Sequence, residues 1–329
     1  MDLVLNTYGA TLTRDQNGFV ISSGGSKQRV PSEGISSIHV GNGAMISSDA
    51  VLFAIENEIE IMFITKGGTP MGRVWSPKYG SISTIRKGQL AFLHSHDSLE
   101  WIKGVLGRKI ENQQALILAM DAKCDVDLEN VKNKAIGKLE VYRTKLLDID
   151  GDFVNDVAAK LRSMEGLASK AYFECMNRFL PERLRFSERS QHPAMDVANA
   201  LLNYGYGVLY SKIEGALIKS GIDPYIGILH SDNYNRPVLA YDVIEIYRVW
   251  VDYVVYSLLC QNIITDEFYS VKEDGSCWLE PLGRRVLIQS LNDYMEEIVG
   301  IGNIKRSRLT QIFLFCQDLA QTFKKVETI

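Results

Sequence analysis

The spacing of hydrophobic residues changes once along the chain, close to residue 80. Before that point, short runs rich in β-branched and aromatic residues alternate with turn residues, which is typical of strands. Asn17-Gly18 is a favoured hairpin pair, and a helix with serine at its start is expected over 47–58. The strands expected in this part are 3–13, 18–23, 35–41, 59–65 and 71–76.

From about Ile85 onward, apolar residues recur at the spacing of one face of a helix. The segment 161–180 has a clear stripe of this kind. A second helix is expected over 197–221, and Gly221 suits its C-cap because glycine readily adopts the left-handed backbone conformation. The second part of the chain is therefore predicted to be helical.

The segment VLAYDVIEIYRVWVDYVV, residues 238–255, has fourteen aliphatic or aromatic residues among eighteen. A membrane span is excluded because each central Asp or Arg would cost roughly 2.5–3.5 kcal/mol. The four polar residues lie three, three and four positions apart, so they share one face of a helix. Such a stripe ordinarily faces water or neutralises itself, but a helix this apolar is usually buried, where carboxylates need a cation partner such as a metal ion. The four residues are Asp242, Glu245, Arg248 and Asp252.

These patterns together predict an α+β protein, with a small N-terminal β-rich domain followed by a larger all-α helical domain. The β-rich domain is expected at 1–80, a linker at 81–88 and the helical domain at 89–329. A chain of 329 residues is long enough for two domains.

Composition and charge narrow the function classes only slightly. The net charge of −4 does not favour nucleic-acid binding, yet basic residues cluster at 177–189, 304–308 and 323–325. Such clusters indicate a phosphate-binding surface, with solvated helix faces as the ordinary alternative. The five cysteines are scattered, which argues against a disulfide framework and a zinc site. The N-terminus lacks the basic region of a secretory signal, so a cytoplasmic protein is expected.

Three polar residues in the helical part form a candidate metal site. Glu165 borders the apolar stripe of 161–180, His230 ends the run before the 238–255 helix, and Glu245 lies within that helix. Two carboxylates and an imidazole suit Mg²⁺ or Mn²⁺, which favour oxygen ligands but accept imidazole. Taken singly, each of the three is ordinarily a boundary or surface residue.

Five segments carry recognisable motifs in a fixed order. One is the strand–helix–strand segment 30–74, and the other four are MEGLASKAYF, ANALLNYGYGVLY, GIDPYIGILH and DVIEIYR. Through them the sequence resembles the Cas1 family, the CRISPR-associated integrases of spacer acquisition, over essentially its whole length. Val197, Ile246 and Val249 stand where the family usually has proline, which bears on backbone shape rather than on ligand chemistry.

The resemblance implies that Glu165, His230 and Glu245 are catalytic residues and ligands of Mg²⁺ or Mn²⁺. It implies a divalent-metal-dependent DNA endonuclease and integrase. In such an enzyme, the 3′-hydroxyl of a short DNA fragment attacks a phosphodiester of the CRISPR repeat, and water in its place gives cleavage.

Four further residues are candidates for a supporting role. The sequence leaves open whether Asp242 is a fourth ligand or holds a ligand in place. Arg248 could orient a carboxylate or contact phosphate, with an internal ion pair as the alternative. Asn203 and Tyr204 are candidates for lining the cleft, with ordinary packing as the alternative.

The resemblance also implies DNA, a second copy of the chain and the small protein Cas2 as partners. Integration at two sites needs two active centres at a fixed separation, which favours a symmetric dimer formed through the β-rich domain. The alternative is a non-catalytic helical DNA-binding scaffold with a β dimerisation module. No membrane association is expected.

Overall fold

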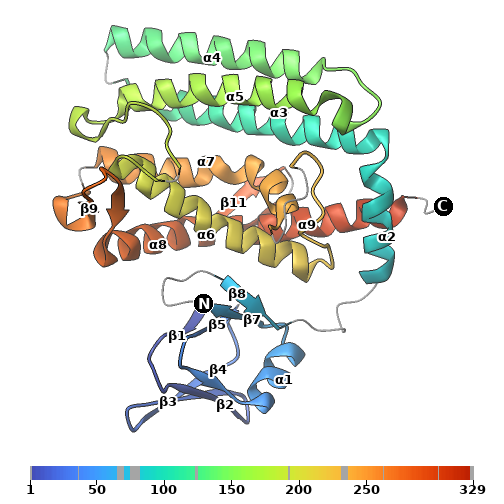
Figure 1. Cartoon of the computed structure of the whole chain (residues 1–329), viewed down its shortest axis with the longest axis vertical. Helices are drawn as coiled ribbons and strands as arrows, with labels where there is room; N and C mark the ends of the chain where they lie inside the picture. The colour runs from blue at the N-terminus through green and yellow to red at the C-terminus, as the bar shows by residue number, and fades with distance from the viewer. Residues whose placement is uncertain are drawn as a thin grey trace. The chain divides into compact units, whose positions relative to one another are not determined.

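The chain divides into two units, Met1–Gly80 and Ser81–Ile329 (Figure 1). Each unit has its own hydrophobic core. This confirms the α+β class, with a strand-rich N-terminal part and a larger helical part. The computed structural model describes residues 2–35, 37–64, 70–74, 82–122, 125–191, 193–230, 236–261, 263–302 and 304–326.

The first unit contains two four-stranded sheets. One has the order β1-β5-β7-β8, in which β1, β5 and β7 are parallel and β8 is antiparallel to β7. The other has the order β4-β3-β2-β6. The strands are β1 (Asp2–Leu5), β2 (Thr11–Asp15), β3 (Gly18–Ser23), β4 (Ser26–Pro31), β5 (Ser37–Gly41), β6 (Met45–Ile46), β7 (Glu60–Ile64) and β8 (Pro70–Arg73).

The helix predicted over 47–58 is α1 (Ser48–Glu56), which precedes β7 in the chain. It begins where predicted because the hydroxyl of Ser47 accepts a hydrogen bond from the amide of Ala50. Its apolar side carries Phe53, which contacts Phe19 of β3 with ring centroids 5.4 Å apart. The helix thereby covers the core of the first unit.

The first hairpin forms where the sequence predicts it, but with a shifted turn. Asp15 and Gly18 are paired across β2 and β3, so the turn residues are Gln16 and Asn17 rather than Asn17-Gly18. Gly18 is required for another reason. A Cβ atom there would lie 2.2 Å from the carbonyl oxygen of Val30 on the adjacent strand.

The second unit is built mainly from helices, confirming the prediction for this part of the chain. Figure 1 shows α3, α4 and α5 side by side in one layer, with α7 between that layer and α6 and α8. The helices are α2 (Ile82–Leu93), α3 (His96–Ala119), α4 (Val126–Leu147), α5 (Val154–Phe179), α6 (Val197–Lys219), α7 (Val238–Cys260), α8 (Pro281–Glu296) and α9 (Arg308–Lys325).

The end of α6 agrees with the prediction in detail. Gly221 has a φ of 79°, and its amide donates to the carbonyl of Ile218 at 2.9 Å. The amide of Ile222 donates to the carbonyl of Leu217 at 3.0 Å. These two bonds form a Schellman motif, which stops the helix and starts the connector that leads to His230.

The structure adds two details to this unit. The linker expected at 81–88 belongs to α2 from Ile82 onward. This short helix is fixed by contact with α9 rather than by a strong pattern of its own, since a Cβ at Gly88 would lie 1.8 Å from the carbonyl oxygen of Phe323. The helical domain also includes a few short strands. It contains two short antiparallel hairpins, formed by β9 (Tyr269–Val271) with β10 (Cys277–Leu279) and by β11 (Ile298–Ile301) with β12 (Ile304–Ser307).

The apolar helix α7 is buried along most of its length, including its charged stripe. Asp242, Glu245 and Asp252 are 0%, 6% and 1% exposed. The alternative in which the stripe faces water is therefore wrong for the three carboxylates. No helix in the described ranges is long and apolar enough to cross a bilayer.

Candidate active site

Side chains from three helices meet around one buried ammonium group. Lys109 of α3 forms ion pairs with Glu165 of α5 and with Glu245 of α7, the second at 2.6 Å between Nζ and Oε2. The lysine side chain is only 6% exposed. The predicted Glu165 and Glu245, 80 positions apart in the sequence, therefore lie on either side of one cation.

The two carboxylates are held by neighbours on their own helices. The hydroxyl of Ser169, one turn after Glu165, donates to Glu165 Oε1 at 2.8 Å. Arg248, nearly one turn after Glu245, donates from Nε to Glu245 Oε1 at 2.9 Å. These contacts fix the side of each helix from which the carboxylate approaches Lys109.

The charge of Glu245 is stabilised although the residue is buried. Burial alone would raise the pKa of its carboxyl, but Arg248 and Lys109 outweigh burial and lower it to about 2. Burial would likewise lower the pKa of Lys109, but Glu245 and Glu165 raise it above its ordinary value. Glu245 and Lys109 are therefore both charged at neutral pH.

One oxygen of this cluster depends on the lysine. Glu245 Oε2 is fully buried, and the ammonium of Lys109 lies 2.6 Å from it. A buried carboxylate oxygen needs a donor or a cation, and Lys109 supplies it here.

His230 is held by Asp242 rather than by the two glutamates. Its Nδ1 lies 2.7 Å from Asp242 Oδ1, and its backbone amide donates to the same oxygen at 3.2 Å. Asp242 Oδ2 accepts from the amides of Ile228 and Leu229 at 2.6 and 3.2 Å. Burial would lower the pKa of His230, but Asp242 outweighs it, so that the pKa is raised.

This arrangement favours one of the two roles considered for Asp242. Both of its oxygens are engaged by the His230 segment, so it holds the histidine in place. With Nδ1 directed at a carboxylate, Nε2 is the ring nitrogen left for a ligand. Glu245 acts on the imidazole through its charge, which also raises the pKa of His230.

The connector that carries His230 is tied to two other helices. The buried side chain of Gln89 on α2 donates to the carbonyls of Asp223 and Ile226 at 2.8 and 3.2 Å and accepts from the amide of Asp223. Arg162 on α5 donates to the carbonyl of Leu229 at 2.7 Å. The position of His230 is therefore set by α2, α5 and α7 together.

The predicted ligand set is brought together only in part. In the described ranges, no group of three or more His, Cys, Asp or Glu side chains is spaced to hold a metal ion. The residues nevertheless fit a divalent cation in type. Two carboxylates already share one cation, and carboxylate oxygens are the ligands that Mg²⁺ and Mn²⁺ prefer.

The other predicted site residues have partners inside the protein. Arg248 pairs with Glu245, donates to the hydroxyl of Tyr210 at 3.2 Å and lies 4.7 Å over the ring of Tyr206. Asn203 accepts from Arg189 at 2.9 Å. It also donates to the carbonyls of residues 190 and 191. Tyr204 is half-buried against the core. Arg248 thus belongs to the cluster, while Asn203 holds the segment before α6.

Sequence reasoning missed the buried lysine. In α3, Leu106, Lys109, Ile110 and Gln113 are all buried and follow the spacing of one helix face. A lysine at an apolar position of such a stripe indicates a buried ion pair, and this signal is visible in the printed sequence.

It also missed a polar cluster around the third carboxylate of α7. Asp252 accepts from the hydroxyl of Tyr172 at 3.0 Å and from that of Tyr206 at 2.5 Å. The ring of Tyr206 also lies beneath the guanidinium of Arg248, which links the Asp252 cluster to Glu245.

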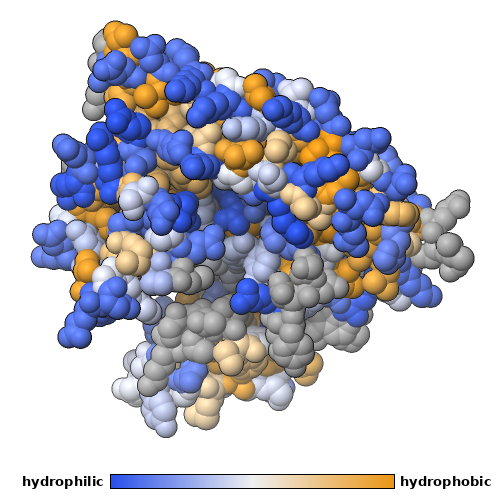
Figure 2. Space-filling model, turned by 45° about the horizontal axis from the view of Figure 1, so that its top comes forward, coloured by the Kyte–Doolittle hydropathy of each residue, from blue (hydrophilic) through white to orange (hydrophobic). Residues whose placement is uncertain are grey.

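The basic clusters predicted as a phosphate surface are partly structural. In the 177–189 segment, Arg183 and Arg185 donate to backbone carbonyls, and Arg189 is held by Asn199 and Asn203. Lys305 on β12 is exposed. On the face shown in Figure 2, hydrophobic residues are scattered among hydrophilic ones.

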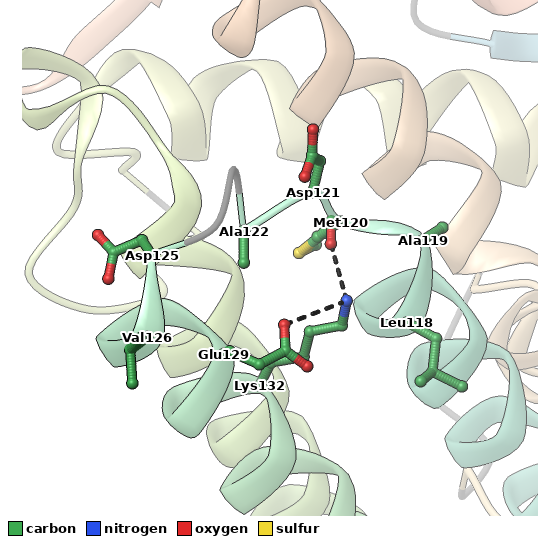
Figure 3. A pocket seen from close by; sticks show the side chains of 9 residues that line it. All are labelled: Leu118, Ala119, Met120, Asp121, Ala122, Asp125, Val126, Glu129 and Lys132. Atoms are coloured by element: carbon green, nitrogen blue, oxygen red, sulfur yellow. Dashed lines mark hydrogen bonds and ion pairs between the residues drawn. The ribbon is translucent and has the colours of Figure 1, made fainter.

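A cavity of about 490 Å³ lies at the end of α3 and the start of α4 (Figure 3). Lys132 points toward its centre and is held by the carbonyl of Met120 at 2.9 Å and by Glu129. None of the predicted site residues lines this cavity.

Comparison with known proteins identifies a match over most of the sequence. A family model described as "CRISPR associated protein Cas1" matches residues 3–293. A "CRISPR-associated endonuclease Cas1 1" of Archaeoglobus fulgidus is 30% identical over 311 residues, which are 90% of this chain and 88% of the relative. A "CRISPR-associated endonuclease Cas1 1" of Thermodesulfovibrio yellowstonii is 31% identical over 75% of each chain.

Solved structures share the fold at lower identity. A Cas1 protein from Thermotoga maritima has a TM-score of 0.77 and 18% identity, covering 100% of this chain and 98% of that one. A casposase bound to an integration product has a TM-score of 0.67 and 20% identity over 99% and 96% of the two chains. A chain of a Cas6-RT-Cas1–Cas2 complex has a TM-score of 0.76 and 19% identity, covering all of this chain and 36% of that one.

Proposed function

The chain belongs to the CRISPR-associated Cas1 family, and from this premise we propose that it is a divalent-metal-dependent DNA endonuclease and integrase. Its task would be to insert short DNA fragments into a CRISPR array. The observation that carries the proposal is the convergence of Glu165 and Glu245 on one buried cation, beside a histidine held by Asp242.

Glu165, Glu245 and Nε2 of His230 would hold Mg²⁺ or Mn²⁺. When bound there, such an ion lowers the pKa of an attacking hydroxyl and polarises the phosphodiester. Arg248 keeps Glu245 ionised inside the protein. Asp242 binds Nδ1 of His230 and so fixes the orientation of the imidazole, which leaves Nε2 as the ligand nitrogen.

The proposed reaction is a phosphodiester exchange. The 3′-oxygen of the incoming fragment forms a bond to phosphorus, and the bond from phosphorus to the 3′-oxygen of the repeat strand breaks. The proton of the attacking hydroxyl leaves, and the departing oxygen gains one. With water as the attacking group, the same exchange is hydrolysis, which agrees with the word endonuclease in the names of the relatives.

The proposed partners are DNA, a second copy of the chain and Cas2. Solved structures of the same fold include a casposase bound to an integration product and an assembly named for Cas1 and Cas2. A symmetric dimer would supply the two active centres that insertion at both repeat ends requires. The β-rich unit is the proposed dimerisation module.

Cleavage and strand joining on branched DNA with Mn²⁺ test this proposal. We expect the wild-type protein to be active, and Glu165→Gln and Glu245→Gln to lower the rate at least a hundredfold. The control is Glu174→Gln, which changes an exposed glutamate on the same helix as Glu165 and should leave the rate unchanged.

The same experiment separates the proposal from the DNA-binding scaffold. Activity that persists in both variants would overturn the ligand assignment. DNA binding without cleavage or joining by the wild-type protein, over a range of Mg²⁺ and Mn²⁺ concentrations, would favour the scaffold.

A further inference from the structure

We propose that Lys109 is an internal counter-cation that holds the acid pair together in the metal-free protein and is displaced when the divalent ion binds. The inference rests on the proposed function, because it assigns the same two glutamates to the ion. It adds a residue and a step to that function: an exchange of one cation for another at a single pair of carboxylates.

The first support is the geometry of the cluster. The ammonium of Lys109 contacts both Glu165 and Glu245 and is almost completely shielded from water. Without a cation between them, two carboxylates that approach the same point would repel each other. Lys109 therefore offsets this repulsion and keeps the two side chains together.

The second support is the contact with Glu245. Its Oε2 is fully buried and lies 2.6 Å from the ammonium, which balances its charge in this structure. Carboxylate oxygens are the ligands that hard divalent ions prefer, so a metal ion would compete with the ammonium for this oxygen.

The neighbouring arginine does not perform the same role. Arg248 contacts Glu245 through Oε1, and its guanidinium is fixed by the hydroxyl of Tyr210 and the ring of Tyr206. Lys109 is the cation shared by the two glutamates, and it sits on a stem of four flexible methylene groups. The lysine is therefore the group that can leave while the arginine stays.

Displacement follows from the charges. The ammonium and a divalent ion would require the same oxygens, and two cations in contact repel strongly where water is excluded. The divalent ion carries the larger charge, so it replaces the ammonium once its concentration is high enough. Lys109 would thus weaken the apparent affinity of the site for the ion, while keeping the ligands assembled before it arrives.

The test measures Mn²⁺ binding rather than activity, by electron paramagnetic resonance of free Mn²⁺ with the full-length protein. Compared with wild type, Lys109→Met should bind Mn²⁺ at least tenfold more tightly, and its melting temperature without metal should fall. The matched control is Lys103→Met. Lys103 is on the same helix, its side chain is 10% exposed and it is paired with Glu100, so its loss should leave Mn²⁺ affinity within twofold of wild type.

The outcomes distinguish this inference from the proposed function. If wild type binds Mn²⁺ and Lys109→Met binds it equally or more weakly, the counter-cation role is overturned while the metal site stands. If neither protein binds Mn²⁺, the metal site and the exchange both fall. Tight binding by Lys109→Met that is abolished by adding Glu165→Gln supports both.

A second measurement uses the wild-type protein and does not depend on the stability of a variant. Brief treatment with an amine-acylating reagent, followed by mass spectrometry, reports the accessibility of each lysine. Lys109 should be protected without metal and become at least fivefold more reactive with saturating Mn²⁺, relative to Lys103. Unchanged protection of Lys109 at saturation would overturn displacement.

Discussion

At the scale of the residue, the site depends on buried charges that are matched one by one. Glu245 is paired with Lys109 and Arg248, while Asp242 faces three backbone amides and an imidazole. Asp252 faces two tyrosine hydroxyls instead of a cation. The three carboxylates of α7 therefore differ in their partners: cations for Glu245, backbone amides and an imidazole for Asp242, and tyrosine hydroxyls for Asp252.

Asp242→Asn should weaken Mn²⁺ binding by roughly tenfold to a hundredfold and lower DNA cleavage in parallel, because a group that orients a histidine ligand tunes metal affinity by that order. The amide retains the shape of the carboxylate but not its charge. Calorimetry of Mn²⁺ binding checks this. Unchanged affinity would show that Asp242 supports only the local backbone.

Asp252→Asn should raise thermal stability more at pH 7 than at pH 4. Burial raises the pKa of Asp252 from 3.8 to about 6, against the opposing effect of the two tyrosine hydroxyls. The folded state therefore binds more protons than the unfolded state between these values, and stability is lost as pH rises through them. Roughly two pH units at about 1.4 kcal/mol each give an effect on the order of 3 kcal/mol.

Melting curves of wild type and variant at both pH values measure this difference. The exposed Asp318 on α9 supplies the control, since Asp318→Asn should change stability by the same small amount at both. An Asp252→Asn variant whose advantage is no larger at pH 7 than at pH 4 would contradict the assignment.

At the scale of the element, the helices are placed by close backbone contacts that single glycines permit. A Cβ at Gly88 of α2 would lie 1.8 Å from a backbone oxygen of α9. By contrast, a Cβ at Gly137 of α4 would have no atom within 4 Å. Both positions are glycine, but Gly88 is in close contact with another helix and Gly137 faces open space.

Gly88→Ala should lower the free energy of unfolding by about 1–3 kcal/mol, because the added methyl group forces α2 away from α9. Gly137→Ala should raise it by about 0.5–1 kcal/mol, because alanine favours the helix and meets open space. Urea titrations of both variants measure these changes. An equal response of the two variants would contradict the close packing of α2 on α9.

The elements also show what sequence patterns can and cannot predict. Long helices such as α5 and α6 are evident from the sequence, because α5 carries an apolar stripe over many turns and α6 is largely apolar and stops at Gly221. The helix α2 and the hairpin of β9 and β10 are short, and tertiary contacts decide them.

The candidate site divides in the same way. The sequence predicted that Glu165 and Glu245 lie close together in one site. In the structure both form ion pairs with the same lysine, Lys109. The lysine itself is signalled only by its position in the apolar stripe of α3. The attachment of His230 to Asp242 depends on the path of the connector, which no local pattern determines.

At the scale of the whole molecule, the two units have separate cores and distinct proposed tasks. The β-rich unit, Met1–Gly80, is proposed to join two copies, and the helical unit carries the candidate site. The contacts described for this site, including those of Gln89, lie within Ser81–Ile329.

The full-length protein should therefore sediment as a dimer, and residues 81–329 alone should be monomeric while keeping their helical circular dichroism. This follows from the separate core of the helical unit and from the proposed dimerisation through the β-rich unit. Sedimentation velocity measures both. A dimeric 81–329 fragment would place the dimer contact on the helices.

The attachment of the His230 connector has a consequence for the timing of the proposed reaction. Gln89, Arg162 and Asp242 restrain this loop from three helices before any nucleic acid is present. The conformational entropy of the His230 side chain is then lost when the protein folds, and not again each time a substrate binds. The imidazole of His230 is therefore already in position each time the protein meets a substrate.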